Sequence, residues 1–433
     1  GGNVGFYDRE TGRTSFVKPV HPEGEYLRFN WNAALALEPG NPEGLYFGSQ
    51  FVHYSSDEGQ SWEIISPDLT TDDPEKQKQL ESGGLTIDAT QAENFTTIIS
   101  IAPSPVDGDV IWVGTDDGNL QITRDGGENW KNLSPSISGF PKGAWIPKIE
   151  VSQENAGEAF IVVNDFRRNN WEPYLFHTKD YGATWNRLVD KNDAASFVAA
   201  FIQDREEPNL MFLGTDDGLY VSFDYGTNWN KWNKEFPSVQ IRDFAIQDRE
   251  ADLAIATFGR AFWILDDLRP LREIASGGAR VLDEEFAVFA APVAYQTSSR
   301  SYDGIRFTAQ GEFIGDNRGT GGKVTVWKKP AIEEEDKEEK MTNENDSKAK
   351  KDRKKGKKKL TSKKTPEEKR DGEATDQKAE MEGEDKDKKK KKKSDKAVMY
   401  VINNAGDTIR TRSRKLEDGI NFITWNLDQK GVE

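Results

Sequence analysis

Carboxylates that precede predicted strands are the residues of this chain whose type and position could carry chemistry. Asp88 and Glu93 precede one apolar segment, and Asp243 precedes another. Hydrolysis of a glycosidic bond needs two carboxyl groups on either side of that bond, one protonated and one ionised. The alternative for Asp243 is an ion pair with Arg242 or Arg260 that only completes the end of a strand. We therefore regard all three as candidates for catalysis.

A second set of residues, suited to binding, lies in the loop at 164–172. This loop contains Arg167, Arg168 and Trp171 together with asparagine and phenylalanine side chains. A tryptophan beside arginines is typical of surfaces that bind peptides or sugars, because the ring offers apolar area and a polar edge. The alternative is that Trp171 packs beneath its own loop. The sequence leaves both interpretations open.

Metal and cofactor chemistry has little support in the sequence. The chain has no cysteine, which excludes a disulfide framework, a zinc-thiolate site and a cysteine nucleophile. The three histidines, His21, His53 and His177, lie far apart, and the last two occupy similar positions in strand-like segments. No glycine-rich phosphate loop or nucleophile elbow is present. We predict no metal site and no cofactor.

One short pattern, Ser/Thr-x-Asp-x-Gly-x-x-Trp, occurs four times along the chain. Its aspartate can accept hydrogen bonds from following backbone N–H groups, its glycine can adopt a positive φ, and its tryptophan can pack between sheets. We therefore expect these residues to build turns and not to catalyse. The copies are Ser55/Asp57/Gly59/Trp62, Thr123/Asp125/Gly127/Trp130, Thr178/Asp180/Gly182/Trp185 and Ser222/Asp224/Gly226/Trp229.

Strand-like segments recur around these turns and indicate a repeat architecture. Each unit opens with an apolar segment, and a second strand that ends in glycine follows in most units. A fifth unit at 240–267 lacks the turn pattern, and 268–271 is expected to be a linker. The opening segments are 33–37, 97–102, 146–151 and 197–202, and the second strands are 45–48, 111–114 and 211–214.

The repeated turn is similar to the Asp-box, or BNR repeat, of β-propellers in sialidases, xyloglucan hydrolases and sortilin-type receptors. Four longer segments resemble bacterial secreted proteins that have a sortilin-type N-terminal propeller and are often labelled glycosyl hydrolases. The resemblance implies an incomplete propeller of about five blades over residues 1–270, with the Asp-boxes on its outer rim. The segments read RFNWN at 28–32, ISPDLT at 65–70, GTDDG at 114–118 and GRAFWILDD at 259–267.

The rest of the chain predicts an interrupted, Ig-like antiparallel β-sandwich at 271–330 and 397–433. Between its halves, residues 331–396 contain 24 Lys or Arg, 20 Asp or Glu and no aromatic residue. Such a segment buries too little apolar surface to offset its chain entropy, so we expect a disordered charged insertion. If it loops out of one hairpin, the strands at 323–328 and 398–403 are expected to be neighbours in one sheet.

Charge and hydropathy limit the partners and the location. The net charge is −16, which argues against nucleic acid as a partner. No apolar run approaches the ~18 residues of a membrane span. The lack of cysteine favours a bacterial origin, and the resemblance implies an extracellular, periplasmic or cell-envelope location. The first residue is not methionine, so we expect a fragment of a longer chain that lacks its signal peptide.

For function, the sequence favours a binding or scaffold protein that presents a propeller face to a protein or a glycan. The alternative is a xyloglucanase-like glycoside hydrolase. A sialidase would need a cluster of arginines, and Arg167, Arg242 and Arg260 show no convergence in the sequence. Two facing carboxylates roughly 5–10 Å apart in a central cleft would favour the hydrolase, whereas scattered, ion-paired acids would favour the binding protein.

Overall fold

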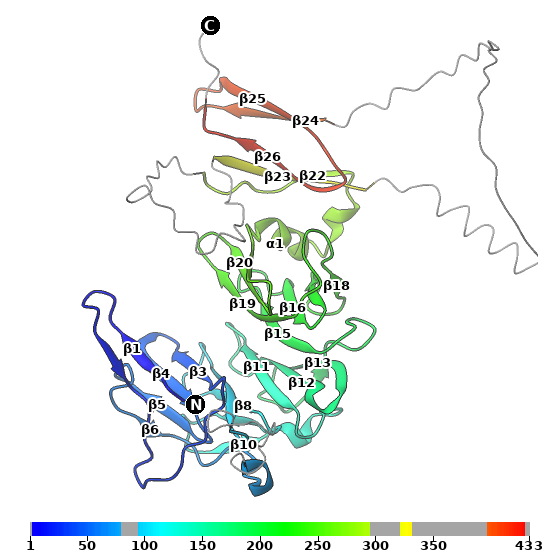
Figure 1. Ribbon diagram of the computed structural model, residues 1–433. Coiled ribbons are helices and arrows are strands. Elements are labelled where there is room, and N and C mark those ends of the chain that lie inside the picture. Colours follow the sequence, from blue (N-terminus) through cyan, green and yellow to red (C-terminus); the bar gives the residue numbers. More distant parts are fainter. Residues whose placement is uncertain (1, 79–93, 295–320, 331–395, 429–433) are drawn as a thin grey trace, which may run out of the picture. The chain divides into compact units, whose positions relative to one another are not determined.

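The computed structural model describes residues 2–78, 94–294, 321–330 and 396–428, and its regular structure is mostly β-strand (Figure 1). The all-β class expected from the sequence is confirmed. The described residues form two compact units, one that ends at Asp283 and one that begins at Glu284. We refer to them as the first and the second unit. The predicted insertion at 331–396 lies almost wholly outside the described residues.

Among its described residues, the first unit contains a hairpin, four four-stranded antiparallel sheets and one three-stranded sheet. The hairpin is β1 (Gly5–Tyr7) and β2 (Thr14–Phe16). The first sheet is β3 (Leu35–Glu38), β4 (Asn41–Gly48), β5 (Val52–Ser55) and β6 (Glu63–Ile64), and the second is β7 (Ile98–Pro103), β8 (Ile111–Thr115), β9 (Leu120–Thr123) and β10 (Trp130–Asn132). The third is β11 (Trp145–Val151), β12 (Ala159–Asp165), β13 (Asn170–Thr178) and β14 (Asn186–Arg187), the fourth is β15 (Val198–Gln203), β16 (Met211–Thr215), β17 (Gly218–Ser222) and β18 (Asn230–Lys231), and the fifth is β19 (Ile241–Gln247), β20 (Asp252–Thr257) and β21 (Phe262–Leu265).

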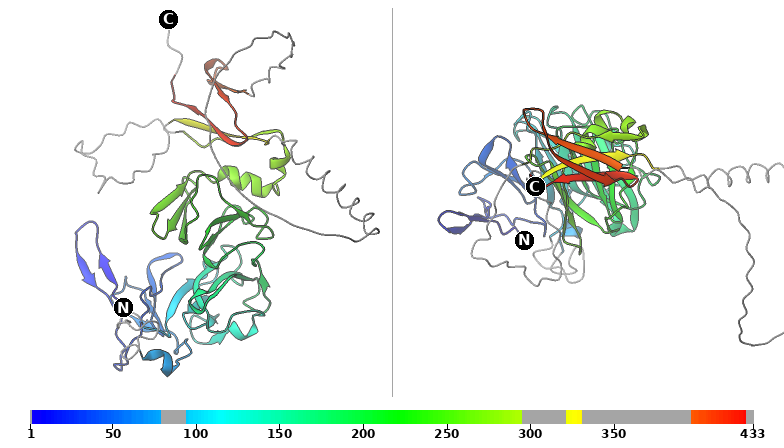
Figure 2. Two further views of the ribbon diagram at one scale, coloured as in Figure 1. Left: turned by 45° about the vertical axis from the view of Figure 1, so that its right-hand side comes forward. Right: turned by 90° about the horizontal axis from the view of Figure 1, so that it is seen from above.

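The five sheets follow one another with their first strands innermost. β3 contacts β7, β7 contacts β11, β11 contacts β15 and β15 contacts β19, so the first strand of each sheet lies beside that of the next (Figures 1 and 2). This is the arrangement of a propeller, and it agrees with the strand-like segments expected from the sequence. Buried apolar side chains fill the space between neighbouring sheets, for example Phe160, Phe201 and Leu213 between the third and the fourth. Full burial of one such side chain stabilises the fold by roughly 1.5–3 kcal/mol.

The four repeated turns join the third and fourth strands of the first four sheets and share one hydrogen-bond pattern. In the first, the Ser55 hydroxyl donates to Asp57 Oδ1 (2.8 Å) and accepts the Gly59 N–H (2.8 Å), and Asp57 Oδ1 accepts the Ser61 N–H (2.8 Å). The hydrogen bonds from the Ser61 hydroxyl, the Ser61 N–H and the Ser55 hydroxyl lower the pKa of Asp57 to about 2. The same bonds recur around Asp125, Asp180 and Asp224.

Each turn also contacts the sheet or hairpin that precedes it. The indole N–H of Trp62 donates to the carbonyl of Val17 (2.7 Å), that of Trp130 to Ile65 (3.1 Å) and that of Trp229 to Leu188 (3.1 Å). Trp185 bonds within its own turn, at the Gly182 carbonyl (3.0 Å), and its ring meets that of Trp112 edge to face. Trp229 is buried and the other three turn tryptophans are half-buried. The turns therefore connect successive sheets.

The expectation of a linker at 268–271 is wrong. Helix α1 (Arg269–Ser276) begins there, with a proline in its first turn, and belongs to the first unit. Its Arg272 donates to Asp204 Oδ2 from Nε (3.0 Å) and Nη2 (2.9 Å), and both side chains are buried. Asp204 follows β15, so α1 is fixed to the fourth sheet. The described 3₁₀ turns are η1 (Pro74–Gln77), η2 (Ser134–Ser136), η3 (Phe166–Arg168) and η4 (Arg280–Asp283).

The second unit contains two sheets in its described part. One has the order β22 (Phe286–Val288), β23 (Gly322–Lys328), β26 (Gly419–Trp425), and the other pairs β24 (Lys396–Ile402) with β25 (Thr408–Lys415). Val326, Leu416 and Ile423 form the core, with Ala397 and Met399 packed against it. The expected pairing of 323–328 with 398–403 is wrong, because β23 already has a hydrogen-bonded partner on each side.

The contact between turn and preceding sheet can be tested at two adjacent glycines. Gly126 and Gly127 both have positive φ (68° and 108°), but a Cβ on Gly127 would lie 2.5 Å from the Ile65 carbonyl oxygen, whereas a Cβ on Gly126 meets nothing closer than 3.5 Å. We expect Gly126→Ala to cost about 1 kcal/mol and Gly127→Ala at least about 2 kcal/mol more. Urea unfolding of both variants measures the difference. Equal losses would show that the close approach does not hold the sheets.

Candidate functional site

Of the three predicted catalytic carboxylates, the structure describes only Asp243. Asp88 and Glu93 lie outside the described residues. Asp243 is exposed on β19, and its Oδ1 lies 3.4 Å from Nζ of Lys148 on β11. Asp243 is therefore ion-paired, as the alternative interpretation expected, but its partner is Lys148 and not Arg242 or Arg260.

Asp243 lines a cavity of about 360 Å³ at the inner strands of the first unit. All five sheets contribute residues to this cavity, either from their strands or from adjoining loops, because their first strands lie side by side. The cavity contains three cationic side chains and one carboxylate among the described residues. Its lining is Asn32, Ile99, Trp145, Pro147, Lys148, Asn164, Phe166, Arg167, Ala199, Arg242 and Asp243. The expectation that Arg167 and Arg242 do not converge is wrong, since both line this one cavity.

Arg167 is held by aromatic rings. It lies in η3, directly after β12, and its guanidinium carbon is 3.4 Å from the ring centre of Trp145 and 4.4 Å from that of Phe166. Burial of the guanidinium and the nearby charge of Arg242 lower the pKa of Arg167 to about 10, so it remains charged at neutral pH. Arg167 forms a long hydrogen bond, 3.5 Å from its Nη1 to Oδ1 of Asn164. Arg167 forms no ion pair with any described residue.

The two other predicted binding residues lie beside the cavity and do not line it. Arg168 forms an ion pair with Asp165 (Nε to Oδ1, 2.5 Å). Trp171 is 49% exposed, its Nε1 donates to Oδ1 of Asn169 (3.1 Å), and its ring packs against Phe166 (6.2 Å between ring centres). Trp171 thus packs partly on its own loop, as one interpretation expected, and partly faces solvent, as a binding surface would require.

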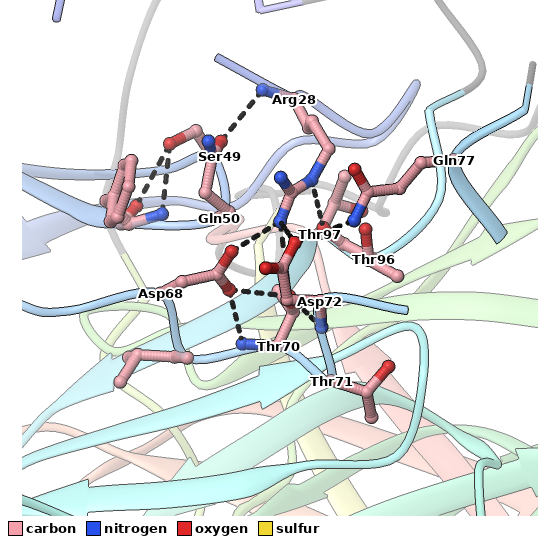
Figure 3. Close-up of polar contacts among 12 residues, drawn as sticks. Arg28, Ser49, Gln50, Asp68, Thr70, Thr71, Asp72, Gln77, Thr96 and Thr97 are labelled. Carbon is pink, nitrogen blue, oxygen red and sulfur yellow. Dashed lines mark hydrogen bonds and ion pairs between the residues drawn. The ribbon is translucent and has the colours of Figure 1, made fainter. Parts of the chain in front are cut away.

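A buried polar network next to the cavity centres on Arg28 (Figure 3). Nη2 of Arg28 donates to Asp68 Oδ2 (2.5 Å) and Thr70 Oγ1 (3.3 Å), and its Nε donates to the Thr96 carbonyl (3.2 Å). The backbone N–H of Arg28 donates to Oε1 of Gln50 (2.8 Å). A buried guanidinium is stable only when its donors are paired, so these contacts hold the loops together.

Two consecutive aspartates extend this network into the second sheet. Asp116, which is fully buried, accepts hydrogen bonds from the Thr97 N–H (2.8 Å) and hydroxyl (2.6 Å) and from the Asn30 amide (3.0 Å). Burial and the charge of Asp117 raise the pKa of Asp116 to about 8. Asp117 in turn accepts the N–H (2.8 Å) and hydroxyl (2.6 Å) of Thr71. The segments at 28–32, 65–70 and 114–118 therefore meet in one network.

The network also fixes the segment that reaches the cavity. Oδ1 of the buried Asn30 accepts the N–H of Asn32 (3.1 Å), and Asn32 lines the cavity. Between them, Trp31 projects into solvent with 72% of its side chain exposed. Sequence reasoning missed Asn32, Trp145 and Lys148. Their positions in the sequence could have identified them, because each lies just before or within the first strand of its sheet, as Asp243 does.

The buried histidines belong to structural contacts. His177 and Tyr225 both donate to Glu158, with His177 Nε2 at 2.8 Å, beside a second cavity of about 180 Å³. Burial alone would raise the pKa of Glu158, but these hydrogen bonds and the charge of Lys179 outweigh it and lower the pKa to about 2. His53 lies in the first sheet, where burial lowers its pKa to about 4. Within the described ranges, no group of three or more acidic or histidine side chains could hold a metal ion.

Comparisons with known proteins give limited matches. No family model matches the sequence. Over 130 residues the chain is 25% identical to the oligoxyloglucan-reducing end-specific xyloglucanase of Emericella nidulans, a match that covers 28% of this chain and 15% of that enzyme. No helix in the described part is long and apolar enough to cross a membrane.

Solved structures with a similar arrangement include two GH74 proteins. An ancestral GH74 enzyme and the GH74 xyloglucanase from Xanthomonas campestris are each 18% identical with a TM-score of 0.41, and the matches cover 55% and 54% of this chain and 28% and 36% of those chains. YCF48 bound to D1 peptide is 14% identical with a TM-score of 0.36, over 59% of this chain and 69% of that one. The chain thus spans about a third or less of the GH74 proteins.

The role of Arg28 can be tested against an exposed arginine. We expect Arg28→Met to lower the free energy of unfolding by about 3 kcal/mol, because it leaves Asp68 and the Thr96 carbonyl without their partner. Arg249→Met removes an exposed pair with Glu250 (3.1 Å) and is expected to cost less than about 1 kcal/mol. Thermal unfolding of both variants provides the comparison. A loss no larger for Arg28→Met than for Arg249→Met would contradict the proposed role of the network.

Proposed function

We propose that this protein binds an oligosaccharide in the cavity at the inner strands of the first unit. The observation that carries the proposal is the composition of that cavity. Amide and cationic donors from several sheets converge on it, and among them only Lys148 forms an ion pair with a described residue. Sugar hydroxyl groups accept and donate hydrogen bonds, so a concave site with amide and guanidinium groups suits them.

Exposed tryptophans beside the cavity support a sugar ligand. Trp31 precedes Asn32, which lines the cavity, and Trp171 packs on Phe166, which also lines it. Trp31 is 72% and Trp171 49% exposed. Large aromatic surfaces in contact with water are a common means of holding the apolar face of a sugar ring, because burial of that surface is favourable. The sequence similarity to a xyloglucanase also favours a carbohydrate ligand.

Glycoside hydrolysis is the second candidate function. It is favoured by the position of Asp243 in the cavity and by the xyloglucanase match. A hydrolase needs a second carboxyl group across the ligand, and Asp243 is the one carboxylate in the cavity lining among the described residues. Asp88 and Glu93 retain their place as candidates for that second group. We therefore place binding first and hydrolysis second.

The family, location, domain organisation and partner of the protein are also proposals. The recurrent turns support membership of the bacterial Asp-box proteins with a sortilin-type propeller, located outside the cell or in its envelope. The proposed organisation is a partial propeller in the first unit, which includes α1 and ends at Asp283, followed by an Ig-like sandwich in the second unit. A protein ligand on the propeller face is a further alternative, and nucleic acid is not proposed as a partner.

Oligosaccharide binding can be tested with aromatic substitutions. On an array of neutral and acidic oligosaccharides that includes xyloglucan fragments, we expect the protein to retain a defined set of glycans. Trp31→Ala and Trp171→Ala are each expected to weaken that binding about fivefold to tenfold, in proportion to the stacking surface lost. Phe16→Ala is the matched control, because Phe16 is 87% exposed on β2 and does not line the cavity. No retained glycan, or equal weakening by all three variants, would contradict the proposal.

Hydrolysis is tested with the same bound glycans. If the protein is a hydrolase, Asp243→Asn is expected to lower the rate of reducing-end release by at least about 100-fold while binding remains within a few-fold, because the amide keeps the shape of the side chain but not its charge. The assay compares reducing-sugar release with affinity for wild type and variant. Undetectable turnover by the wild type on glycans that it binds would reject this second candidate.

A further inference from the structure

The charge of the cavity differs from that of the chain as a whole. The chain carries a net charge of −16, yet Lys148, Arg167 and Arg242 line the cavity with Asp243 as the single carboxylate among the described residues. Asp243 pairs with Lys148 (3.4 Å), which leaves the two arginines without a carboxylate partner among the described residues. Two like charges in one concavity repel each other, and an anion that enters relieves this repulsion.

The two arginines are arranged to receive an anion. The guanidinium of Arg167 is stacked over Trp145 (3.4 Å), so its conformation is largely set before a ligand arrives and less side-chain entropy is lost on binding. Arg242 is exposed on β19, with a hydrogen bond of 3.3 Å from Nη1 to Oε1 of Gln240. Gln240 also donates to Asp216 (3.0 Å), which holds its amide in place. A planar guanidinium matches a carboxylate in a bidentate geometry.

We propose that the cavity takes an acidic oligosaccharide, one whose uronate carboxylates pair with Arg167 and Arg242. This inference rests on the proposed function and specifies the class of sugar. The exposed rings of Trp31 and Trp171 would hold the sugar rings, and the two arginines would select for the charged substituent. Asp243 keeps Lys148 neutralised, so the selective charge is that of the arginines.

The experiment compares two tetrasaccharides that differ only in their charged groups. Tetragalacturonate carries carboxylates where α-1,4-linked galactotetraose carries hydroxymethyl groups. By titration calorimetry in low salt, we expect tetragalacturonate to bind at least tenfold more tightly, and the difference to shrink as the salt concentration rises. Tetraglutamate serves as an acidic probe without sugar rings and is expected to bind at least tenfold more weakly than tetragalacturonate.

Substitutions assign the preference to the arginines. Arg242→Gln and Arg167→Gln are each expected to weaken tetragalacturonate binding about tenfold more than they weaken galactotetraose binding, because the amide keeps a hydrogen-bond donor for hydroxyl groups but loses the charge. Arg167→Lys keeps the charge but not the planar stack, and is expected to fall between wild type and Arg167→Gln. Arg249→Gln removes the same charge from a side chain that is 80% exposed and does not line the cavity, and is expected to change neither affinity. Far-UV spectra and melting temperatures show that each variant is folded.

The outcomes separate this inference from the proposed function. If galactotetraose binds as tightly as tetragalacturonate, or if the arginine variants weaken both equally, the acidic preference is wrong while oligosaccharide binding stands. If neither tetrasaccharide binds but other glycans on the array do, the acidic preference is again wrong. If no glycan binds at all, the proposed function itself fails. If tetraglutamate binds as well as tetragalacturonate, the cavity recognises acidic peptides and the sugar assignment is wrong.

Discussion

The contact between each repeated turn and the sheet before it is the constraint on which the first unit depends. Trp62, Trp130 and Trp229 each donate an indole N–H to a backbone carbonyl of the preceding element. At Gly127 and Gly182 an added Cβ would lie 2.5 Å from an atom of the preceding sheet or the segment after it. Each contact joins a tryptophan side chain of the turn to a backbone carbonyl, so it does not depend on the identity of the residue that accepts. These contacts link each sheet to the element before it, and the first strands of successive sheets converge. The cavity exists because of that convergence, although no residue of the turns reaches it.

The Arg28 network connects the loops of the first unit, as the repeated turns connect its sheets. Its ion pair with Asp68 (Figure 3) and the hydrogen bonds around Asp116 tie three loops that come from different parts of the sequence. The buried groups satisfy one another, so displacing one loop would leave the partners in the others unpaired, at a cost of several kcal/mol. The network also positions Trp31 and Asn32. Both are exposed, but the Asn32 N–H donates to the buried side chain of Asn30.

Local patterns in the sequence predicted those parts of the structure that local interactions determine. The repeated turns could be located because their hydrogen bonds lie within a few residues of Asp57 and its equivalents. The first strands could be located because each is a short apolar segment. Helix α1 was missed because Leu268-Arg269-Pro270-Leu271 is short, and its position depends on a distant partner, Asp204. The convergence of Arg167 and Arg242 could not be read from the chain either. Their separation in sequence is large, and only the side-by-side packing of β11, β15 and β19 brings them to one cavity.

Asp116 and Asp243 are two of the described acidic groups near the inner strands, and their environments differ. Asp116 has the raised pKa, about 8, that a general acid requires, but it is fully buried and its oxygens are occupied by Thr97 and Asn30. Asp243 lines the cavity but is paired with Lys148. Hydrolysis needs a protonated and an ionised carboxyl group that both reach the ligand. Here the group with the suitable pKa supports the loops, and the group that reaches the cavity organises its charge.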